Sequence, residues 1–440
     1  MIADLAIRHR RVLTVFSAAL AVRLVFNLGL HPPLDYVFSD MAGYLGRAAR
    51  LFDQAPGVVD PYSTFYPFGT HYLVALIQAL FGRESRHAIG VVFAALGAGA
   101  VAYAFATAAR LCPSRPRLLA VYAALLVLHV PHVMLGGFVL SEIPFAFALA
   151  ASVFHLVRHD TTGSMGDAAM AGVALAVGAT LRPQAAVSVA ILALVFALRR
   201  GRRPGPAPAR LSASSVLAFA APIALVVTFG ALRAQHHVGR YAFISTNGAF
   251  NLAIGRCHAS RLSATKTPHS AFEAPSLKHL ETFKDKHGIE PLIALDPALG
   301  PTVKIDAEVW DEAAARRKAA ECVRATGALR QLKYSASHVV LMYLYNLPWP
   351  TRGALANVWA GLQLAWIPGA LVGLARGATR PRSSEALVAA QGWALLLVAM
   401  VFFGEARLRV PYDPFLMWMA LAAYAPIAER LYARLRRRPR

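Results

Sequence analysis

The feature that most constrains this chain is the alternation of long apolar stretches with short clusters of arginine. Of its 440 residues, 57% are hydrophobic and only 15% are charged. Soluble domains carry roughly 25% charged residues. Several of the apolar runs approach the roughly 20 residues that a helix needs to cross a bilayer. The pattern therefore predicts an all-α polytopic membrane protein.

The apolar stretches predict about ten transmembrane helices. They lie at about residues 12–30, 88–109, 118–134, 143–157, 168–181, 185–198, 212–232, 354–374, 386–403 and 410–428. Two further apolar runs, 73–81 and 335–345, are too short to span, and we expect interfacial or re-entrant helices there. No small-residue cleavage site follows the first apolar stretch, so we expect it to be an anchor.

The arginine clusters predict how the chain is oriented. With ten spans, six basic clusters fall on one side of the membrane, at residues 8–11, 113–117, 158–160, 199–210, 375–382 and 433–440. Cytoplasmic loops carry such an excess of Lys and Arg. The net charge of +22 is thus explained without nucleic-acid binding. We expect a multi-pass protein of the bacterial inner membrane with both termini cytoplasmic.

This topology divides the chain into three parts. Residues 1–232 form an N-terminal transmembrane module that includes a first external loop, 31–87. Residues 233–334 form a polar periplasmic segment, and residues 335–440 form a C-terminal transmembrane module with an interfacial helix.

Two carboxylates, Asp35 and Asp40, follow the first span closely. The spacing of Asp40, Tyr44 and Ala48 places these residues on one face of a short helix. A carboxylate beside a membrane must be solvated, paired or functional. Taken alone, the pattern is equally consistent with a solvated loop acid.

Three other charged groups are expected on the same external side. Glu142 begins a span, where a helix N-terminus also favours an acid. Arg182 ends a span, where it also fits an arginine that extends to the interface. Glu405, Arg407 and Arg409 crowd into one short turn, and extension to the interface does not explain three charges of both signs.

These residue types suit one kind of chemistry. A carboxylate can take a proton from an acceptor hydroxyl or amine. Arginine binds phosphate bidentately and can stabilise a departing phosphate. If acid and arginine converge, they could transfer a group from a lipid phosphate, but the sequence alone does not show that they converge.

Six short motifs occur in one order along the chain. They are DMAGYLGRA (40–48), YPFG (66–69), LSEIPF (140–145), LRPQ (181–184), STNGAFN (245–251) and GEARLRVPYDP (404–414). In this order and topology the chain resembles the integral-membrane GT-C glycosyltransferases, in particular the group that contains lipid A aminoarabinose transferase and the protein O-mannosyltransferases.

The resemblance implies an inverting transfer of a sugar from a polyprenyl-phosphate donor to a glycan, lipid or protein acceptor outside the membrane. It places the catalytic general base on Asp40 and a second acid on Glu142. The implied substrate-binding residues are Tyr44, Tyr66, Arg182, Glu405, Arg407 and Arg409, with the lipid phosphate on Arg407 and Arg409. No cofactor and no metal ligands are expected, although a divalent cation at the acidic site stays open.

The chain departs from the family pattern at both acids. The paired Asp-Glu of the O-mannosyltransferases is Ser39-Asp40 here, which argues against that subgroup. The second acid is Glu142, where relatives often have Asp. The soluble part is small, so acceptor-recognition modules are missing.

A carrier or flippase for a lipid-linked or anionic solute is the alternative. It predicts ionisable residues near the middle of the membrane, where Arg23 is the main candidate. Most other charges lie at one face, which favours an interfacial enzyme. Cys257 and Cys322 both fall in the external segment, and the sequence leaves open whether they form a disulfide.

Overall fold

The computed structural model describes residues 2–37, 40–55, 57–83, 85–200, 212–257, 261–266, 302–344 and 354–436. Its α-helices are α1 (Ile2–Leu24), α2 (Asp40–Asp53), α3 (Tyr62–Phe65), α4 (Gly69–Phe81), α5 (Arg86–Leu111), α6 (Pro116–Val127), α7 (Val130–Gly136), α8 (Glu142–Thr162), α9 (Met165–Leu181), α10 (Ala185–Arg200), α11 (Ala213–Val238), α12 (Asn247–Cys257), α14 (Glu312–Leu344), α15 (Ala354–Thr379), α16 (Glu385–Val401), α17 (Ala406–Arg409) and α18 (Asp413–Arg436). A π-helix (Val25–Leu30) and two 3-10 turns (Pro33–Asp35 and Val410–Tyr412) complete the helical part.

The nearly all-α architecture confirms the predicted fold class. Four helical segments in the described part are long and apolar enough to cross a membrane: His9–Asp35, His87–Leu111, Pro116–Gly136 and Ala213–Val238. Shorter apolar helices lie at Gly69–Phe81, Met165–Leu181, Ala185–Arg199 and Glu385–Val401. The total of ten spans stays a prediction.

The helices differ from one predicted span, one predicted interfacial helix and two predicted part boundaries. The stretch 118–134 is two helices, broken at Leu128 and His129, because Pro131 lacks a backbone N–H and disfavours helical backbone just before it. The apolar run 335–345 continues a longer helix, α14, as far as Leu344. The expected part boundaries at 232 and 334 fall inside α11 and α14, and the three-part division stays a prediction.

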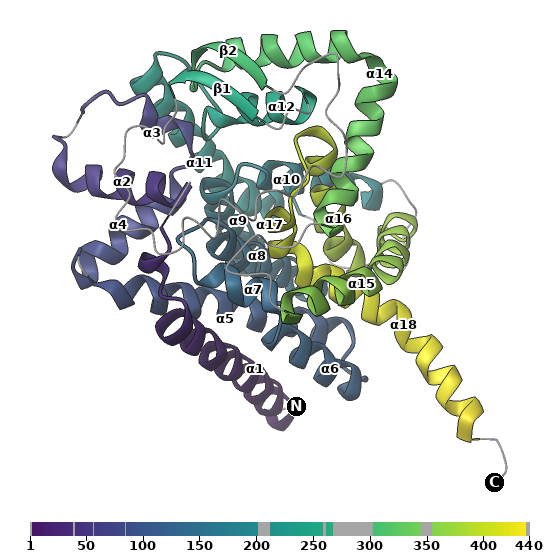
Figure 1. Cartoon of the computed structure of the whole chain (residues 1–440). Coiled ribbons are helices and arrows are strands. Elements are labelled where there is room, and N and C mark those ends of the chain that lie inside the picture. The colour runs from purple at the N-terminus through teal and green to yellow at the C-terminus, as the bar shows by residue number, and fades with distance from the viewer. Residues whose placement is uncertain are drawn as a thin grey trace.

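The elements form a helical body with a cap on one face (Figure 1). Helix α8 packs between α5 and α9 at the centre, with α1 along α5 and α11 along α9. The cap consists of α12, α14 and a two-stranded parallel sheet, β1 (Arg261–Lys266) and β2 (Thr302–Glu308), in which Arg261 pairs with Thr302. The start of α1 and the end of α18 lie on the face opposite this cap (Figure 1).

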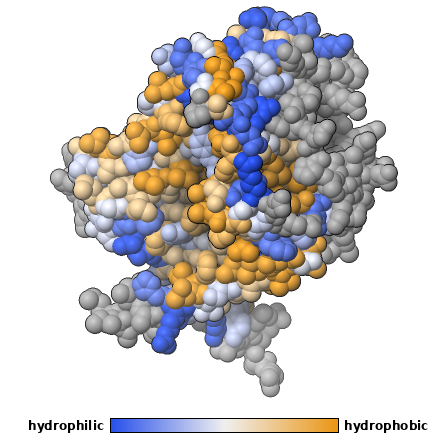
Figure 2. All heavy atoms as spheres, turned by 90° about the vertical axis from the view of Figure 1, so that its left-hand side faces the viewer, coloured by the Kyte–Doolittle hydropathy of each residue, from blue (hydrophilic) through white to orange (hydrophobic). Residues whose placement is uncertain are grey.

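Small residues dominate the contacts between the central helices, as is typical of membrane helices. On α9, for example, a Cβ at Gly172 would overlap the carbonyl oxygen of Phe219 on α11, so the two backbones touch. On the outside, apolar residues occupy much of the middle of one face, interrupted by a hydrophilic strip that runs down from the top, and further hydrophilic residues lie at the bottom (Figure 2). Exposed apolar side chains include Leu76 and Leu80 of α4 and Leu217 and Leu225 of α11. This distribution suits a molecule surrounded by lipid.

We expect Gly69→Ala to destabilise the protein by about 1–3 kcal/mol, the usual cost of overpacking. Gly69 begins α4, and a Cβ there would lie 2.8 Å from the carbonyl carbon of Thr180 and 2.9 Å from its oxygen. The midpoint of thermal unfolding in detergent measures the effect. Gly248→Ala is the control, since its Cβ would meet no atom within 4 Å. Equal midpoints for the two variants would contradict this close contact.

Cys257 and Cys322 form a disulfide, with 5.0 Å between their Cα atoms. It joins the end of α12 to α14 across 65 residues of sequence. For a loop of that length, the chain-entropy model gives a stabilisation of about 4 kcal/mol.

We therefore expect replacement of both cysteines by alanine to lower the unfolding midpoint of the purified protein. A reducing agent should lower the midpoint of the wild type by a similar amount. Cys112→Ala is the control, because Cys112 is a free cysteine. A midpoint unchanged by both reduction and replacement would be inconsistent with a stabilising bond.

Candidate active site

Asp40 lies at the start of α2, where a helix N-terminus favours an acid. The buried face of α2 includes Met41, Tyr44 and Ala48, in agreement with the predicted helical spacing. Tyr66 follows α3 in extended backbone, and its hydroxyl donates to Asp40 Oδ1 at 2.9 Å. The rings of Tyr44 and Tyr66 pack with centroids 5.4 Å apart. Two aromatic residues thus fix the surroundings of this carboxylate.

Arg407 reaches the same carboxylate from the far end of the chain. Its Nη1 donates to Asp40 Oδ2 at 3.0 Å, although the two residues are 367 positions apart. Its Nε donates to Glu405 Oε2 at 2.9 Å and lies 3.7 Å from Glu142 Oε1. The structure therefore brings the two predicted acids, Asp40 and Glu142, together with Glu405 and Arg407.

Glu142 completes the cluster from the start of α8. Its Oε1 accepts a hydrogen bond from Arg182 Nη2 at 2.8 Å, and Arg182 Nε donates to Ser141 Oγ at 3.0 Å. The Glu142 side chain is only 1% exposed. A buried carboxylate needs such partners, because loss of hydration is costly for a charge.

Exposure separates the members of this cluster. The side chains of Asp40, Arg407 and Glu405 are 20%, 18% and 34% exposed, so they are partly accessible to solvent. Glu142 is shielded from solvent, and its Oε1 lies 3.7 Å from Arg407 Nε on the buried side of the cluster. Among the described residues, no group of three or more His, Cys, Asp or Glu side chains is arranged to hold a metal ion.

The cluster is strongly coupled electrostatically. Burial alone would lower the pKa of the Arg407 guanidinium, but the surrounding carboxylates, Glu405 first, outweigh it and hold this pKa well above its ordinary value. Burial, reinforced by the charge of Asp40, raises the pKa of Tyr44 to about 12. The same two causes raise the pKa of Tyr66. Both tyrosines therefore stay neutral at physiological pH, and Arg407 stays charged.

Arg409 does not join this cluster. It is 1% exposed, and its Nη1 and Nη2 donate to the Met342 carbonyl at 2.8 Å and to Gln363 Oε1 at 2.5 Å. Its Nε lies 2.8 Å from Asp413 Oδ1. The sequence treats Arg407 and Arg409 as equivalent, but residues two apart on a helical turn face different ways. Arg409 instead ties α17 to α14, α15 and α18.

Two residues of the site were not singled out from the sequence. Arg47 is buried, with its guanidinium carbon 4.3 Å from the centre of the Tyr66 ring and its Nε donating to the Tyr62 carbonyl at 3.1 Å. Its position seven residues after Asp40, on the same helix face, was the available signal. Ser141, next to Glu142, was identifiable only by its neighbour.

One family model matches part of the chain. Residues 66–228 match the family described as dolichyl-phosphate-mannose-protein mannosyltransferase. This region contains Tyr66, Glu142 and Arg182. It does not contain Asp40 or the turn with Glu405, Arg407 and Arg409. No curated protein sequence matches the chain significantly.

Solved structures with a similar fold extend over nearly the whole chain. The oligosaccharyltransferase of Archaeoglobus fulgidus, in its apo form, is 14% identical with a TM-score of 0.53, covering 97% of this chain and 52% of its own. The same enzyme, AglB, in complex with an inhibitory peptide and a dolichol-phosphate is 14% identical with a TM-score of 0.50, covering 96% and 51%. ArnT from Cupriavidus metallidurans is 13% identical with a TM-score of 0.39, covering 94% and 76%.

This chain thus spans about half the length of the archaeal oligosaccharyltransferase. At these identities the likeness concerns the fold. Together with the matched region 66–228, this likeness in fold supports the resemblance to the GT-C glycosyltransferases that the motifs predicted.

Proposed function

We propose that this protein transfers a sugar from a polyprenyl-phosphate donor to an acceptor on the non-cytoplasmic side of the membrane. The observation that carries the proposal is the contact between Asp40 and Arg407, a partly exposed pair of a carboxylate and a guanidinium group. The matched mannosyltransferase family and a structural neighbour in complex with a dolichol-phosphate support a lipid-phosphate donor.

In the proposed reaction, Asp40 accepts the proton of the acceptor hydroxyl or amine. The freed lone pair forms a bond to the anomeric carbon of the sugar. The bond from that carbon to the phosphate oxygen breaks, and its electron pair leaves with the lipid phosphate. This single displacement inverts the anomeric configuration, because no covalent intermediate with the enzyme forms.

Arg407 would stabilise the departing phosphate. The cluster pairs three carboxylates (Asp40, Glu142 and Glu405) with two guanidinium groups (Arg182 and Arg407). Because these three carboxylates already surround Arg407, a donor phosphate would compete with a carboxylate there. We expect the Asp40 carboxylate to give way to the phosphate, because an Asp40 released from Arg407 is also available as a base.

The remaining residues take supporting roles in this proposal. Glu142 and Arg182 hold Arg407 from the buried side, and Tyr66 orients Asp40 through its hydrogen bond. Glu405 accepts a hydrogen bond from Arg407 Nε, and the buried Tyr44 packs against Tyr66. Arg409 would act by anchoring α17, since its donors are engaged within the protein.

The proposed location follows from the same topology. The cluster lies where α8 begins and α9 has just ended, which the predicted topology assigns to the side opposite the basic clusters of the sequence. The start of α1 and the end of α18 share the face opposite the cap (Figure 1). An inner-membrane protein with cytoplasmic termini and a periplasmic active site is consistent with both.

The alternative of a carrier or flippase draws on Arg23, which is fully buried. Its Nη1 donates to the Ala19 carbonyl at 3.1 Å, and its Nη2 lies 3.0 Å from His132 Nδ1. The guanidinium stem also packs against Gly97. These contacts are those of an arginine that joins helices, which favours the enzyme over the carrier.

The donor class can be tested with purified protein in lipid. We expect release of lipid phosphate from undecaprenyl-monophosphate sugars, because one arginine suits a monophosphate. The kcat/KM for undecaprenyl-diphosphate sugars and for nucleotide sugars should be at least about 100-fold lower, a size of discrimination that binding sites reach between related substrates. Preference for a nucleotide sugar would overturn the proposed donor.

A further inference from the structure

The segment that carries Glu405 and Arg407 is irregular where it leaves α16. Helix α16 ends at Val401, and α17 begins at Ala406. Residues 402–405 between them lie outside any helix. The position of Arg407 therefore depends on what holds this connection.

Arg256 of α12 binds the end of α16, although it lies 144 positions earlier in the sequence. Its Nη2 donates to the Met400 carbonyl at 2.6 Å, and its Nη1 donates to Ser335 Oγ at 3.2 Å. The Ser335 hydroxyl donates to the same Met400 carbonyl at 2.8 Å. The last carbonyls of a helix lack partners within it and favour a nearby cation. Arg256 thus caps α16 directly before the irregular connection.

Two glycines bring the backbones into contact at the same place. A Cβ at Gly255 would overlap the carbonyl oxygen of Phe402, and a Cβ at Gly404 would overlap that of His338. The connection is therefore held between the end of α12 and the C-terminal part of α14, directly before Glu405.

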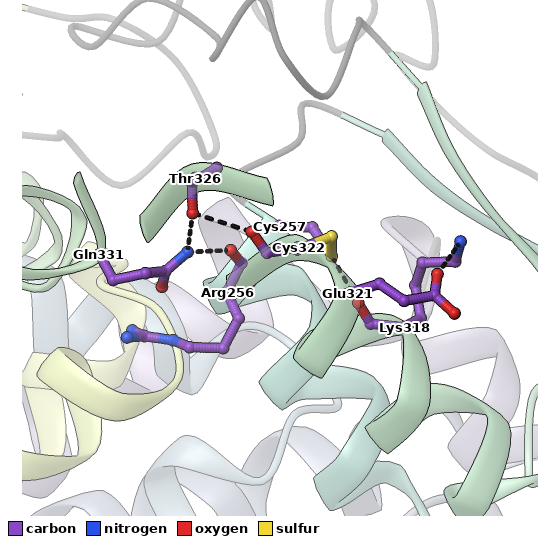
Figure 3. The surroundings of a disulfide bond; sticks show 7 residues. All are labelled: Arg256, Cys257, Lys318, Glu321, Cys322, Thr326 and Gln331. Carbon is purple, nitrogen blue, oxygen red and sulfur yellow. Dashed lines mark hydrogen bonds and ion pairs between the residues drawn. A yellow bond between two sulfur atoms is a disulfide. The ribbon is translucent and has the colours of Figure 1, made fainter. Parts of the chain in front are cut away.

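The end of α12 is itself fixed to α14 by the disulfide (Figure 3). Cys257 follows Arg256 in the chain, and both Cys257 and Cys322 are buried, at 0% and 2% exposure. The covalent bond restrains the backbone from which the Arg256 side chain extends.

Hydrogen bonds add a second attachment to α14 (Figure 3). Gln331 Nε2 donates to the Arg256 carbonyl and to Thr326 Oγ1, both at 2.8 Å. Thr326 and Gln331 lie on either side of Gly327, where a φ of 77° interrupts the helix. Such a positive φ favours glycine. The interruption of α14 thus places Gln331 to bind the end of α12.

We propose that Arg256 is a positioning residue for Arg407. It holds the end of α16, and through the backbone of 400–404 it keeps Arg407 in place to meet Asp40 and the donor phosphate. The disulfide and Gln331 in turn keep Arg256 in place. The catalytic consequence of this inference rests on the proposed function. The effect of Arg256 on the backbone of 402–409 can be measured separately.

The test compares Arg256→Met with Arg240→Met in the full-length protein. Arg240 is the matched control, because it binds the Trp310 carbonyl and Asp311 in the same cap and has no described contact with 400–409. In Arg256→Met we expect amide hydrogen exchange in 402–409 to accelerate about 10-fold, the size expected for loss of a charged hydrogen bond. Binding of undecaprenyl phosphate should weaken by a similar factor, with the acceptor KM unchanged.

Two further variants test whether Arg256 positions Arg407 or only stabilises the fold. Arg256→Lys should recover part of the loss, because it keeps one charged donor to the Met400 carbonyl. In an Arg407→Gln background, Arg256→Met should weaken undecaprenyl-phosphate binding less than about 2-fold further, as expected when two residues act through one interaction. Full additivity of the two losses would contradict the proposal.

The outcomes also distinguish this inference from the proposed function. If the wild type transfers no sugar but only Arg256→Met accelerates exchange in 402–409, the positioning stands and the transferase proposal fails. If the wild type transfers sugar while Arg256→Met matches Arg240→Met in exchange and binding, the positioning is wrong and the transferase proposal stands.

Discussion

Asp40→Asn is expected to lower sugar transfer by about 1,000-fold, within the range for loss of a general base. The amide keeps the size of the side chain and can still accept the Tyr66 hydrogen bond, but it cannot take a proton from the acceptor. Binding of undecaprenyl phosphate should persist or strengthen, because Arg407 loses a competing carboxylate. The measurements are the initial rate of transfer and the affinity for the lipid phosphate.

Asp53→Asn is the matched control for this prediction. Asp53 ends the same helix, but it is 59% exposed and pairs with Arg83 at the surface. It should change transfer less than 2-fold, a size typical of surface substitutions. Transfer by Asp40→Asn at the wild-type rate would remove Asp40 as the base.

Arg407→Gln is expected to reduce kcat by about 100- to 1,000-fold, the usual loss for one group that stabilises a leaving oxyanion. It also leaves Asp40, Glu142 and Glu405 without their shared cation. Affinity for undecaprenyl phosphate should therefore fall as well. Steady-state kinetics and direct lipid binding measure the two effects.

Arg407→Lys should recover only part of this loss. Lysine restores the charge but lacks the planar fork with which Arg407 binds Asp40 and Glu405 at once. Equal activity in the Gln, Lys and wild-type proteins would show that Arg407 does not bind the departing phosphate. Gln363→Leu removes a partner of Arg409. It therefore tests the contacts that anchor Arg409 without altering the charged cluster around Arg407.

The helices were predictable because membrane-spanning helices appear in the sequence as long apolar runs. The helix face shared by Asp40 and Tyr44 was predictable from local spacing alone. The break at His129 was missed because the local signal, Pro131, lies inside an otherwise continuous apolar stretch.

The assembly of the site was not predictable by the same reasoning. Asp40 and Arg407 are 367 positions apart, and no periodicity relates residues at that distance. Arg407 and Arg409 lie on one turn and face different ways, but the distant partners that each one meets, Asp40 and Gln363, depend on the tertiary packing. The disulfide was undecided for the same reason, since pairing of cysteines depends on a distance that the sequence does not contain.

Following a labelled sugar from donor to acceptor tests the proposed reaction most directly. Purified wild type, Asp40→Asn and Arg407→Gln would each be incubated in lipid with labelled undecaprenyl-phosphate sugars and a membrane extract. We predict that label leaves the donor and appears on an acceptor with the wild type alone. Binding of the donor without transfer by any of the three proteins, or equal transfer by all three, would contradict a glycosyltransferase built on Asp40 and Arg407.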